Sequence, residues 1–270
     1  MSVVADVRPE LVDRPLAQVK TISFPASDGV SIPAYLTLPV GSAGKKLPAI
    51  VLPHGGPSAR DEWGFDWLSQ FLAARGYAVI QPNYRGSSGY GEGWMGQNGF
   101  REWKKSIGDI SSAGRFLVKE GIADPAKLVI LGWSYGGYAA LQSAAVEPAL
   151  YKAAVAIAPV TDLSLLKREA SGFTNAKLVA DFVGSGDHLV QGSPLKQAAA
   201  IKVPVLLAHG DMDSNVSSLH SVRMADALRK TGTKVEFMRF KELDHQLDDD
   251  VARTELLTRI ATFLDQAVGK

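Results

Sequence analysis

Short apolar segments alternate with amphipathic segments along most of the chain, and their order predicts the fold. From about residue 47 onward, apolar runs are followed by loops and then by helical patterns. The expected strands cover residues 49–52, 77–81, 128–131, 153–157, 203–208 and 235–240. The expected helices cover residues 66–75, 105–120, 136–145, 217–230 and 251–268. Strands that alternate with helices indicate an α/β fold, with a mainly parallel twisted sheet and helices on both faces.

The beginning of the chain has a different pattern. Residues 19–24 and 30–38 are strand-like, and the second run places alternate apolar side chains on one face. Asp28 and Gly29 stand between the two runs and are a typical hairpin signal. We therefore expect two antiparallel strands at the start of the sheet.

One segment, from about residue 161 to about residue 200, interrupts the alternation of strands and helices. It has helical patterning and contains Gly184, Gly186 and Gly192. Because α/β folds bind ligands beyond the carboxyl ends of their strands, we interpret this segment as an insertion near the site. Residues 1–18 are expected to form a linker or arm, and residues 19–270 a single catalytic domain.

Composition and charge exclude several classes of function. The chain has 270 residues, of which 46% are hydrophobic and 21% charged, as in an ordinary globular enzyme. A net charge of +1 with scattered basic residues gives no sign of a nucleic-acid or membrane partner. The absence of cysteine excludes thiol catalysis and cysteine-ligated zinc. The chain as written shows neither a signal peptide nor a membrane span, so we expect a cytoplasmic protein.

A candidate nucleophile lies between an apolar strand and a helical pattern. Residues 127–138 read KLVILGWSYGGY and match G-x-S-x-G at Gly132, Ser134 and Gly136. In this context the pattern forms a nucleophile elbow, a turn so tight that a Cβ at either glycine would strike neighbouring backbone. The following helix start offers free N–H groups to a developing negative charge. Ser134 is therefore the predicted nucleophile.

A serine hydroxyl needs a base, and in this fold the chain order is serine, acid, histidine. His245 follows the expected strand at residues 235–240, in a loop from which a ring can reach Ser134. His220 falls inside a helical pattern and His188 in the insertion, whereas His209, at a strand end, suits a loop-shaping hydrogen bond. His245 is therefore the predicted base.

The acid of the triad fixes the tautomer of the imidazole and stabilises the imidazolium. Asp211 and Asp213 both follow the expected strand at residues 203–208, and their position alone does not choose between them. Asp244 adjoins His245, but the side chains of neighbouring residues usually diverge. We therefore expect the acid to come from the loop that follows the strand at residues 203–208.

Together these motifs resemble the catalytic domain of the prolyl oligopeptidase family of serine peptidases, especially its acylaminoacyl-peptidase and dipeptidyl-peptidase branches. The matching segments, in family order, are HGGP at 54–57, NYRGSSGYG at 83–91, GWSYGGY at 132–138, APV at 158–160 and HGDMDSNV at 209–216. The resemblance implies the α/β-hydrolase fold. In the family pattern H-G-x-x-D-x-x-V the acid is the fifth position, which selects Asp213, and His245 stands where the final histidine belongs.

The resemblance also implies further residues of the site. The backbone N–H groups of Tyr135 and Gly55 would form the oxyanion hole, with each donor contributing on the order of 3 kcal/mol. Asn215 matches an asparagine that holds a substrate carbonyl in the dipeptidyl-peptidase branch. The residues expected to contact the substrate are His54, Val160, Asn215 and Val216, beside the Tyr135 side chain.

The predicted function is hydrolysis of a peptide or ester bond through an acyl-enzyme, with no cofactor and no metal. A peptidase of small peptides is the main interpretation. The family's N-terminal β-propeller has no match in this chain, which gives weight to the alternative of a stand-alone carboxylesterase of short acyl esters. An inactive α/β-hydrolase that serves as a binding scaffold is the alternative from another class. Self-association into a homo-oligomer is left open.

Overall fold

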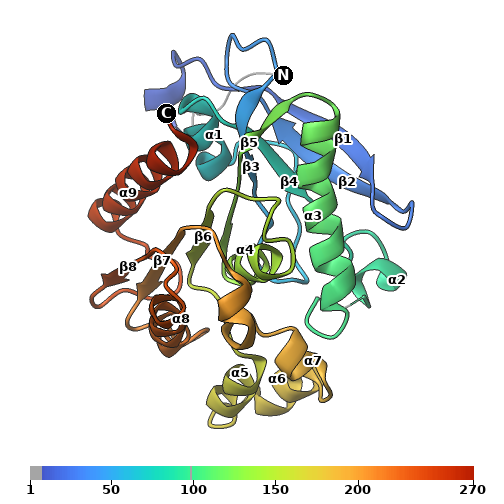
Figure 1. The fold of residues 1–270 in the computed structure, drawn as a ribbon, viewed down its shortest axis with the longest axis vertical. Helices are drawn as coiled ribbons and strands as arrows, with labels where there is room; N and C mark the ends of the chain where they lie inside the picture. The colour runs from blue at the N-terminus through green and yellow to red at the C-terminus, as the bar shows by residue number, and fades with distance from the viewer. Residues whose placement is uncertain (1–7, 98) are drawn as a thin grey trace.

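The computed structural model describes residues 8–97 and 99–270, which form a twisted sheet between two layers of helices (Figure 1). The described strands are β1 (Val19–Pro25), β2 (Ser31–Thr37), β3 (Leu47–Val51), β4 (Ala78–Pro82), β5 (Ala123–Trp133), β6 (Ala154–Ile157), β7 (Val205–Gly210) and β8 (Val235–Phe240). Their order across the sheet is β1-β2-β4-β3-β5-β6-β7-β8. β1 and β2 run antiparallel to their neighbours, whereas β3 to β8 pair in parallel. The predicted fold class is therefore confirmed.

The described helices are α1 (Trp67–Ala74), α2 (Glu92–Met95), α3 (Trp103–Lys119), α4 (Tyr135–Val146), α5 (Leu163–Ala170), α6 (Ala176–Val183), α7 (His188–Gln191), α8 (Leu219–Lys230) and α9 (Asp250–Val268). Two 3₁₀ helices, Pro9–Leu11 and Pro194–Ala200, complete the set for this part of the chain. Side chains of Asp66, Asp162 and Asp249 accept hydrogen bonds from the first turns of α1, α5 and α9. These caps satisfy N–H groups that lack a partner inside the helix.

Two apolar cores lie on opposite faces of the sheet. Successive strand side chains point to opposite faces, so that Ile50 packs with α1 and α9, whereas Val51 packs with α3 and α4. The five residues of β4 are all buried, because helices cover both faces. This explains why the central strands appear in the sequence as short continuous apolar runs.

The N-terminal strands pair antiparallel as expected, with Pro25 opposite Ser31 beside the turn. Gly29 adopts a φ of +83°, which glycine tolerates readily. Residues 1–7 of the expected arm lie outside the described residues. Further along, the backbone N–H and carbonyl of Ala17 pair with the side chain of Gln70 at 2.9 and 2.8 Å, which attaches this segment to α1.

The segment from 161 to 200 leaves the sheet after β6 and returns at β7. It contains α5, α6, α7 and the second 3₁₀ helix, which lie beyond the end of α4 at the bottom of Figure 1. Other differences from the expected elements include α2, which occupies part of the predicted loop before α3, and β5, which starts at Ala123 rather than at Leu128. Among the described helices, none is long and apolar enough to cross a membrane.

Candidate active site

The turn between β5 and α4 holds Ser134 in a conformation that non-glycine residues rarely adopt. Its φ is 59° and its ψ is −120°. A Cβ on Gly132 would overlap the carbonyl oxygen of Gly136, and one on Gly136 would overlap that of Pro53. The G-x-S-x-G pattern thus reflects backbone packing, and strained residues of this kind are concentrated at functional sites.

The backbone around Ser134 is fixed on both sides. Its N–H donates to the carbonyl of Ile157 at the end of β6 (2.8 Å), and its own carbonyl accepts from the N–H of Tyr138 in α4 (2.9 Å). The side chain is half-buried and therefore reachable from solvent. The hydroxyl stands at the amino end of α4, beyond the carboxyl ends of the parallel strands.

Asp213 and His245 form a pair, with Asp213 Oδ2 2.6 Å from His245 Nδ1. The other oxygen, Oδ1, accepts from the N–H groups of Asn215 (2.8 Å) and Val216 (2.9 Å). His209 Nε2 adds a contact of 3.1 Å to Oδ2. Burial alone would raise the pKa of Asp213, but the contacts with His209, His245 and Val216 outweigh it and lower the pKa below its usual value. The carboxylate is therefore ionised at neutral pH.

The contacts of Asp211 and Asp213 distinguish the two candidates for the acid, which their positions in the sequence did not. Asp211 Oδ1 accepts from the N–H of Glu242 at 2.6 Å and thereby joins the loops after β7 and β8. Asp213, two residues later, faces His245. His209 has the loop-shaping role expected of it, since its Nε2 lies 2.8 Å from the carbonyl oxygen of Val216 and its Nδ1 lies 2.7 Å from Ser221 Oγ.

The loop that carries His245 is attached beside Ser134. Trp133, the residue before Ser134, donates from its indole Nε1 to the carbonyl of His245 at 2.9 Å. Met212 donates its N–H to the carbonyl of Leu243 at 3.0 Å, which fixes the same loop against the end of β7. Among the described residues no hydrogen bond joins the Ser134 hydroxyl to the His245 ring; the contact between the two segments runs from the Trp133 indole to the backbone of His245.

The backbones of Tyr135 and Gly55 border this position. Tyr135 is the first residue of α4, so its N–H has no acceptor within the helix. Gly55 approaches the elbow from the loop after β3: a Cβ there would lie 3.3 Å from the carbonyl oxygen of Trp133 and 3.5 Å from Ser134 Cβ. The backbone of the HGGP segment therefore lies directly against the elbow.

The His54 ring supports the HGGP loop. It stacks on Tyr84, with ring centroids 4.4 Å apart, and its Nδ1 lies 2.7 Å from the carbonyl oxygen of Gly55. Its Nε2 lies 2.8 Å from Ser87 Oγ. Burial lowers the pKa of His54 to about 4, so the ring is neutral at pH 7. These contacts orient the Gly55 peptide, and the expected contact between His54 and a substrate stays a prediction.

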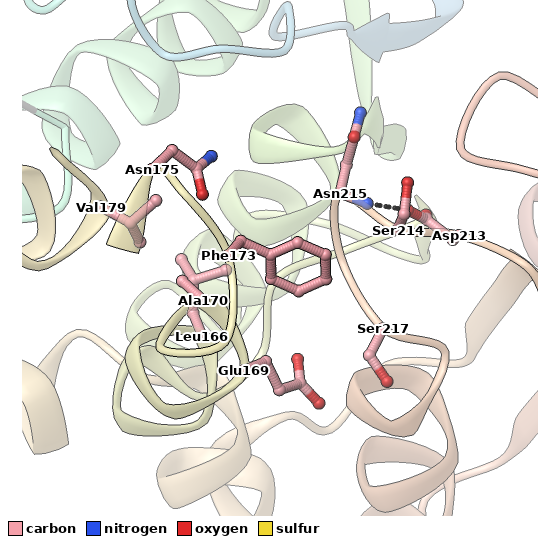
Figure 2. A pocket seen from close by; sticks show the side chains of 10 residues that line it. All are labelled: Leu166, Glu169, Ala170, Phe173, Asn175, Val179, Asp213, Ser214, Asn215 and Ser217. Atoms are coloured by element: carbon pink, nitrogen blue, oxygen red, sulfur yellow. Dashed lines mark hydrogen bonds between the residues drawn. The ribbon is translucent and has the colours of Figure 1, made fainter. Parts of the chain in front are cut away.

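The residues expected to contact the substrate differ in their exposure. Val160 and Val216 are buried, whereas Asn215 is exposed and lines a cavity (Figure 2). The Tyr135 side chain is fully buried and donates its hydroxyl to the carbonyl of Gly99 at 3.0 Å. Its ring packs in an aromatic cluster with Tyr84, Phe100 and Tyr138.

Sequence reasoning did not single out the residues on the far side of that cavity. They come from α5, from the turn after it and from α6, and include Glu169, Phe173 and Val179. The one available signal was the interruption of the strand–helix alternation at residues 161–200, which indicated a region but no side chain. Among the described residues, no three histidine, aspartate or glutamate side chains gather in a way that could hold a metal ion.

The parallel sheet, the strained serine after β5 and the aspartate–histidine pair after β7 and β8 define this protein as a member of the α/β-hydrolase class. A model of the prolyl oligopeptidase family matches residues 63–270. The chain belongs to the prolyl oligopeptidase family, a family of serine hydrolases.

Known relatives agree with this assignment. Dipeptidyl aminopeptidase BIII of Pseudoxanthomonas mexicana is 33% identical over 254 residues, which cover 88% of this chain and 37% of the relative. Dipeptidyl peptidase family member 6 of Caenorhabditis elegans is 31% identical over 293 residues, covering 97% and 40%. The crystal structure of a puromycin hydrolase is similar with a TM-score of 0.87 at 26% identity, covering 94% of this chain and 40% of that one. The chain thus spans about two fifths of the length of these relatives.

Proposed function

We propose that this chain is a serine peptidase that cleaves its substrate through an acyl-enzyme, with Ser134 as nucleophile, His245 as base and Asp213 as the acid. One observation carries the proposal. Asp213 is hydrogen-bonded to His245, and the loop that holds His245 is itself hydrogen-bonded to Trp133, which precedes the strained Ser134. Nucleophile, base and orienting acid are the three groups that acyl transfer by a serine requires.

The reaction follows from the tautomer of the histidine. His245 donates its Nδ1–H to Asp213, which leaves Nε2 as a proton acceptor. Nε2 takes the proton of Ser134 while Oγ attacks the substrate carbonyl carbon. The imidazolium then gives this proton to the leaving nitrogen, the carbon–nitrogen bond breaks, and an ester to Ser134 remains. Water repeats the sequence, releases the carboxylic acid and restores the serine hydroxyl.

The negative charge that develops on the carbonyl oxygen needs donors that are already in place. The N–H groups of Tyr135 and Gly55 are proposed for this oxyanion hole, since one begins α4 and the other belongs to the loop packed against the elbow. Because these donors are parts of fixed backbone, they need no reorganisation as the charge forms. Asp213, kept ionised by its hydrogen bonds, would stabilise the imidazolium in the same step.

Substrate contacts are proposed from the residues that surround the elbow. Asn215, exposed at the cavity in Figure 2, is proposed to bind a substrate carbonyl. His54, Val160 and Val216 are proposed to border the position of the residue before the scissile bond. We further propose that residues 19–270 are the catalytic domain, with residues 1–18 as an arm and residues 161–200 as an insertion that shapes the site.

A panel of aminoacyl-arylamides beside short p-nitrophenyl esters tests the bond that is cleaved. We expect hydrolysis of both, because the same acyl-enzyme forms from an amide or an ester. Turnover of the esters alone would replace the peptidase with the carboxylesterase. Turnover of neither by folded protein would favour the inactive scaffold. A cytoplasmic location is a prediction that cell fractionation tests, and light scattering would show whether the chain forms the homo-oligomer that its sequence leaves open.

A further inference from the structure

A cavity of about 640 Å³ adjoins the loop of the catalytic acid (Figure 2). One wall is the 213–217 loop, and the other comes from α5 and the segment that leads to α6. In Figure 2 the ring of Phe173 projects into the space between these walls, Asn215 lies at one side, and Glu169 and Ser217 lie together at another. This volume falls within the range typical of small-ligand pockets.

The charge of the lining has one sign. Two carboxylates, Glu169 and Asp213, belong to it, and among the described residues that line it there is no lysine, arginine or histidine. Asp213 is occupied by hydrogen bonds from backbone N–H groups and by His245. Glu169 therefore supplies the charge that is open to a ligand, and its side chain keeps 26% of its surface exposed.

Glu169 is held in place by a fully buried histidine of α8. His220 Nδ1 accepts from the N–H groups of Thr161 (3.0 Å) and Asp162 (3.3 Å), which places the ring proton on Nε2. That nitrogen lies 3.4 Å from Glu169 Oε2. Both atoms are buried, and among the described residues neither has a hydrogen-bond partner, so the ion contact is what joins them. The contact fixes one carboxylate oxygen and leaves the rest of the group beside the cavity.

Glu169 stays ionised in this environment. Burial would raise its pKa, but the contact with His220 and, more weakly, the Ser217 hydroxyl and the charge of Arg223 outweigh it and lower the pKa. Among the ion pairs of the described residues, Glu169 takes part in the contact with His220, and none joins it to Arg223.

We propose that Glu169 makes the enzyme selective for a lysine or arginine residue immediately before the scissile bond. The inference rests on the proposed function, because it assumes acyl transfer at Ser134. The long stem of such a side chain would pack on Leu166 and Phe173, which line the cavity, while its charged end reaches Glu169. The aromatic face of Phe173 also attracts a cation. α5 begins just after Val160, which connects the cavity with the expected position of that residue.

Pairs of substrates of nearly equal size separate the effect of the side chain's charge from that of its shape. Arginyl and citrullyl arylamides have nearly the same size, but only the first carries a cation, and lysyl and norleucyl arylamides form a second pair. We expect kcat/KM to favour the charged member of each pair about 10- to 100-fold, as for a hydrogen bond to a charged group. In Glu169→Gln the ratio within each pair should fall to about one.

Two controls keep this test specific. Glu255→Gln removes the same charge from the exposed face of α9 and should keep the wild-type ratio. Reaction of Ser134 with a fluorophosphonate reports the proposed function separately. If Ser134 reacts but the charged and neutral substrates are handled equally by wild type, the inference about Glu169 is wrong and the proposed function stands. If Ser134 in folded protein does not react, both are contradicted.

Discussion

Asp213 and His245, which follow β7 and β8 respectively, are joined by a 2.6 Å hydrogen bond between Oδ2 and Nδ1. β7 and β8 are neighbours and parallel, so their following loops emerge at the same edge of the sheet. Trp133 connects this pair to the elbow through the carbonyl of His245. One hydrogen bond thus fixes the histidine tautomer, and a second fixes the place of its loop.

Replacing Asp213 by asparagine tests the role of this pair. Asparagine cannot hold His245 with its proton on Nδ1 and cannot stabilise the imidazolium, so we expect kcat to fall about 10⁴-fold with the fold intact. The matched control is Asp211→Asn, since Asp211 joins two loops without facing His245. Steady-state kinetics on one arylamide compare the two variants. Equal losses in both would contradict the assignment of Asp213.

Gly55→Ala tests the second donor of the proposed oxyanion hole. The new Cβ would lie 3.3 Å from the carbonyl oxygen of Trp133, so the loop must shift away from the elbow. Loss of one oxyanion donor lowers kcat by about 10²–10³-fold, and a displaced donor should cost part of this. Gly93→Ala, with no atom within 4 Å of its Cβ, is the control. If Gly55→Ala keeps the wild-type kcat, Gly55 is not a donor of the oxyanion hole.

His54 should make the protein less stable in acid. Its pKa is lowered to about 4 in the folded state, against an ordinary value of 6.5. Between these pH values the unfolded chain binds a proton that the folded protein does not, so stability falls as the pH is lowered from 6.5 to 4. The loss between pH 7 and pH 4.5 should be about 2 kcal/mol. Urea unfolding of wild type and His54→Asn should show this pH-dependent difference; a constant difference would contradict it.

Asp61 should have the opposite effect. Burial, together with the charge of Asp66, raises the pKa of this carboxyl to about 7. Its buried Oδ2 accepts no hydrogen bond from any residue that the structure describes. Because the unfolded chain loses this proton near pH 4, the group destabilises the folded protein increasingly as the pH rises to 7. We expect Asp61→Asn to gain about 2 kcal/mol over wild type between pH 5 and pH 8. An unchanged difference in unfolding free energy would show that Asp61 is ionised in the folded protein.

The sheet could be predicted because each strand carries its own signal. The apolar runs, the Asp28–Gly29 turn and the glycines around Ser134 are local, and each constrains backbone geometry directly. The order of the strands is not local: β4 lies between β2 and β3, although β3 comes first in the chain. Pairing of this kind depends on contacts between distant residues, which periodicity does not record.

The residues of the candidate site also differ in whether a local sequence signal could predict them. Ser134 and His245 could be predicted from motif, order and position after a strand, and Asp213 needed the family pattern, since Asp211 occupies an equivalent place in the sequence. The role of Glu169 could not be predicted. It depends on a contact with His220 in another helix and on the cavity between α5 and the 213–217 loop. A glutamate in a helical pattern otherwise indicates an exposed face.

The central claim is that the Ser134 hydroxyl is the activated nucleophile. Incubation of the folded protein with a fluorophosphonate, followed by peptide mass spectrometry, measures this directly. A single adduct on Ser134 is the expected result, formed much more slowly in Asp213→Asn and absent in Ser134→Ala. Folded wild-type protein that carries no adduct, or carries it on another residue, would contradict the claim.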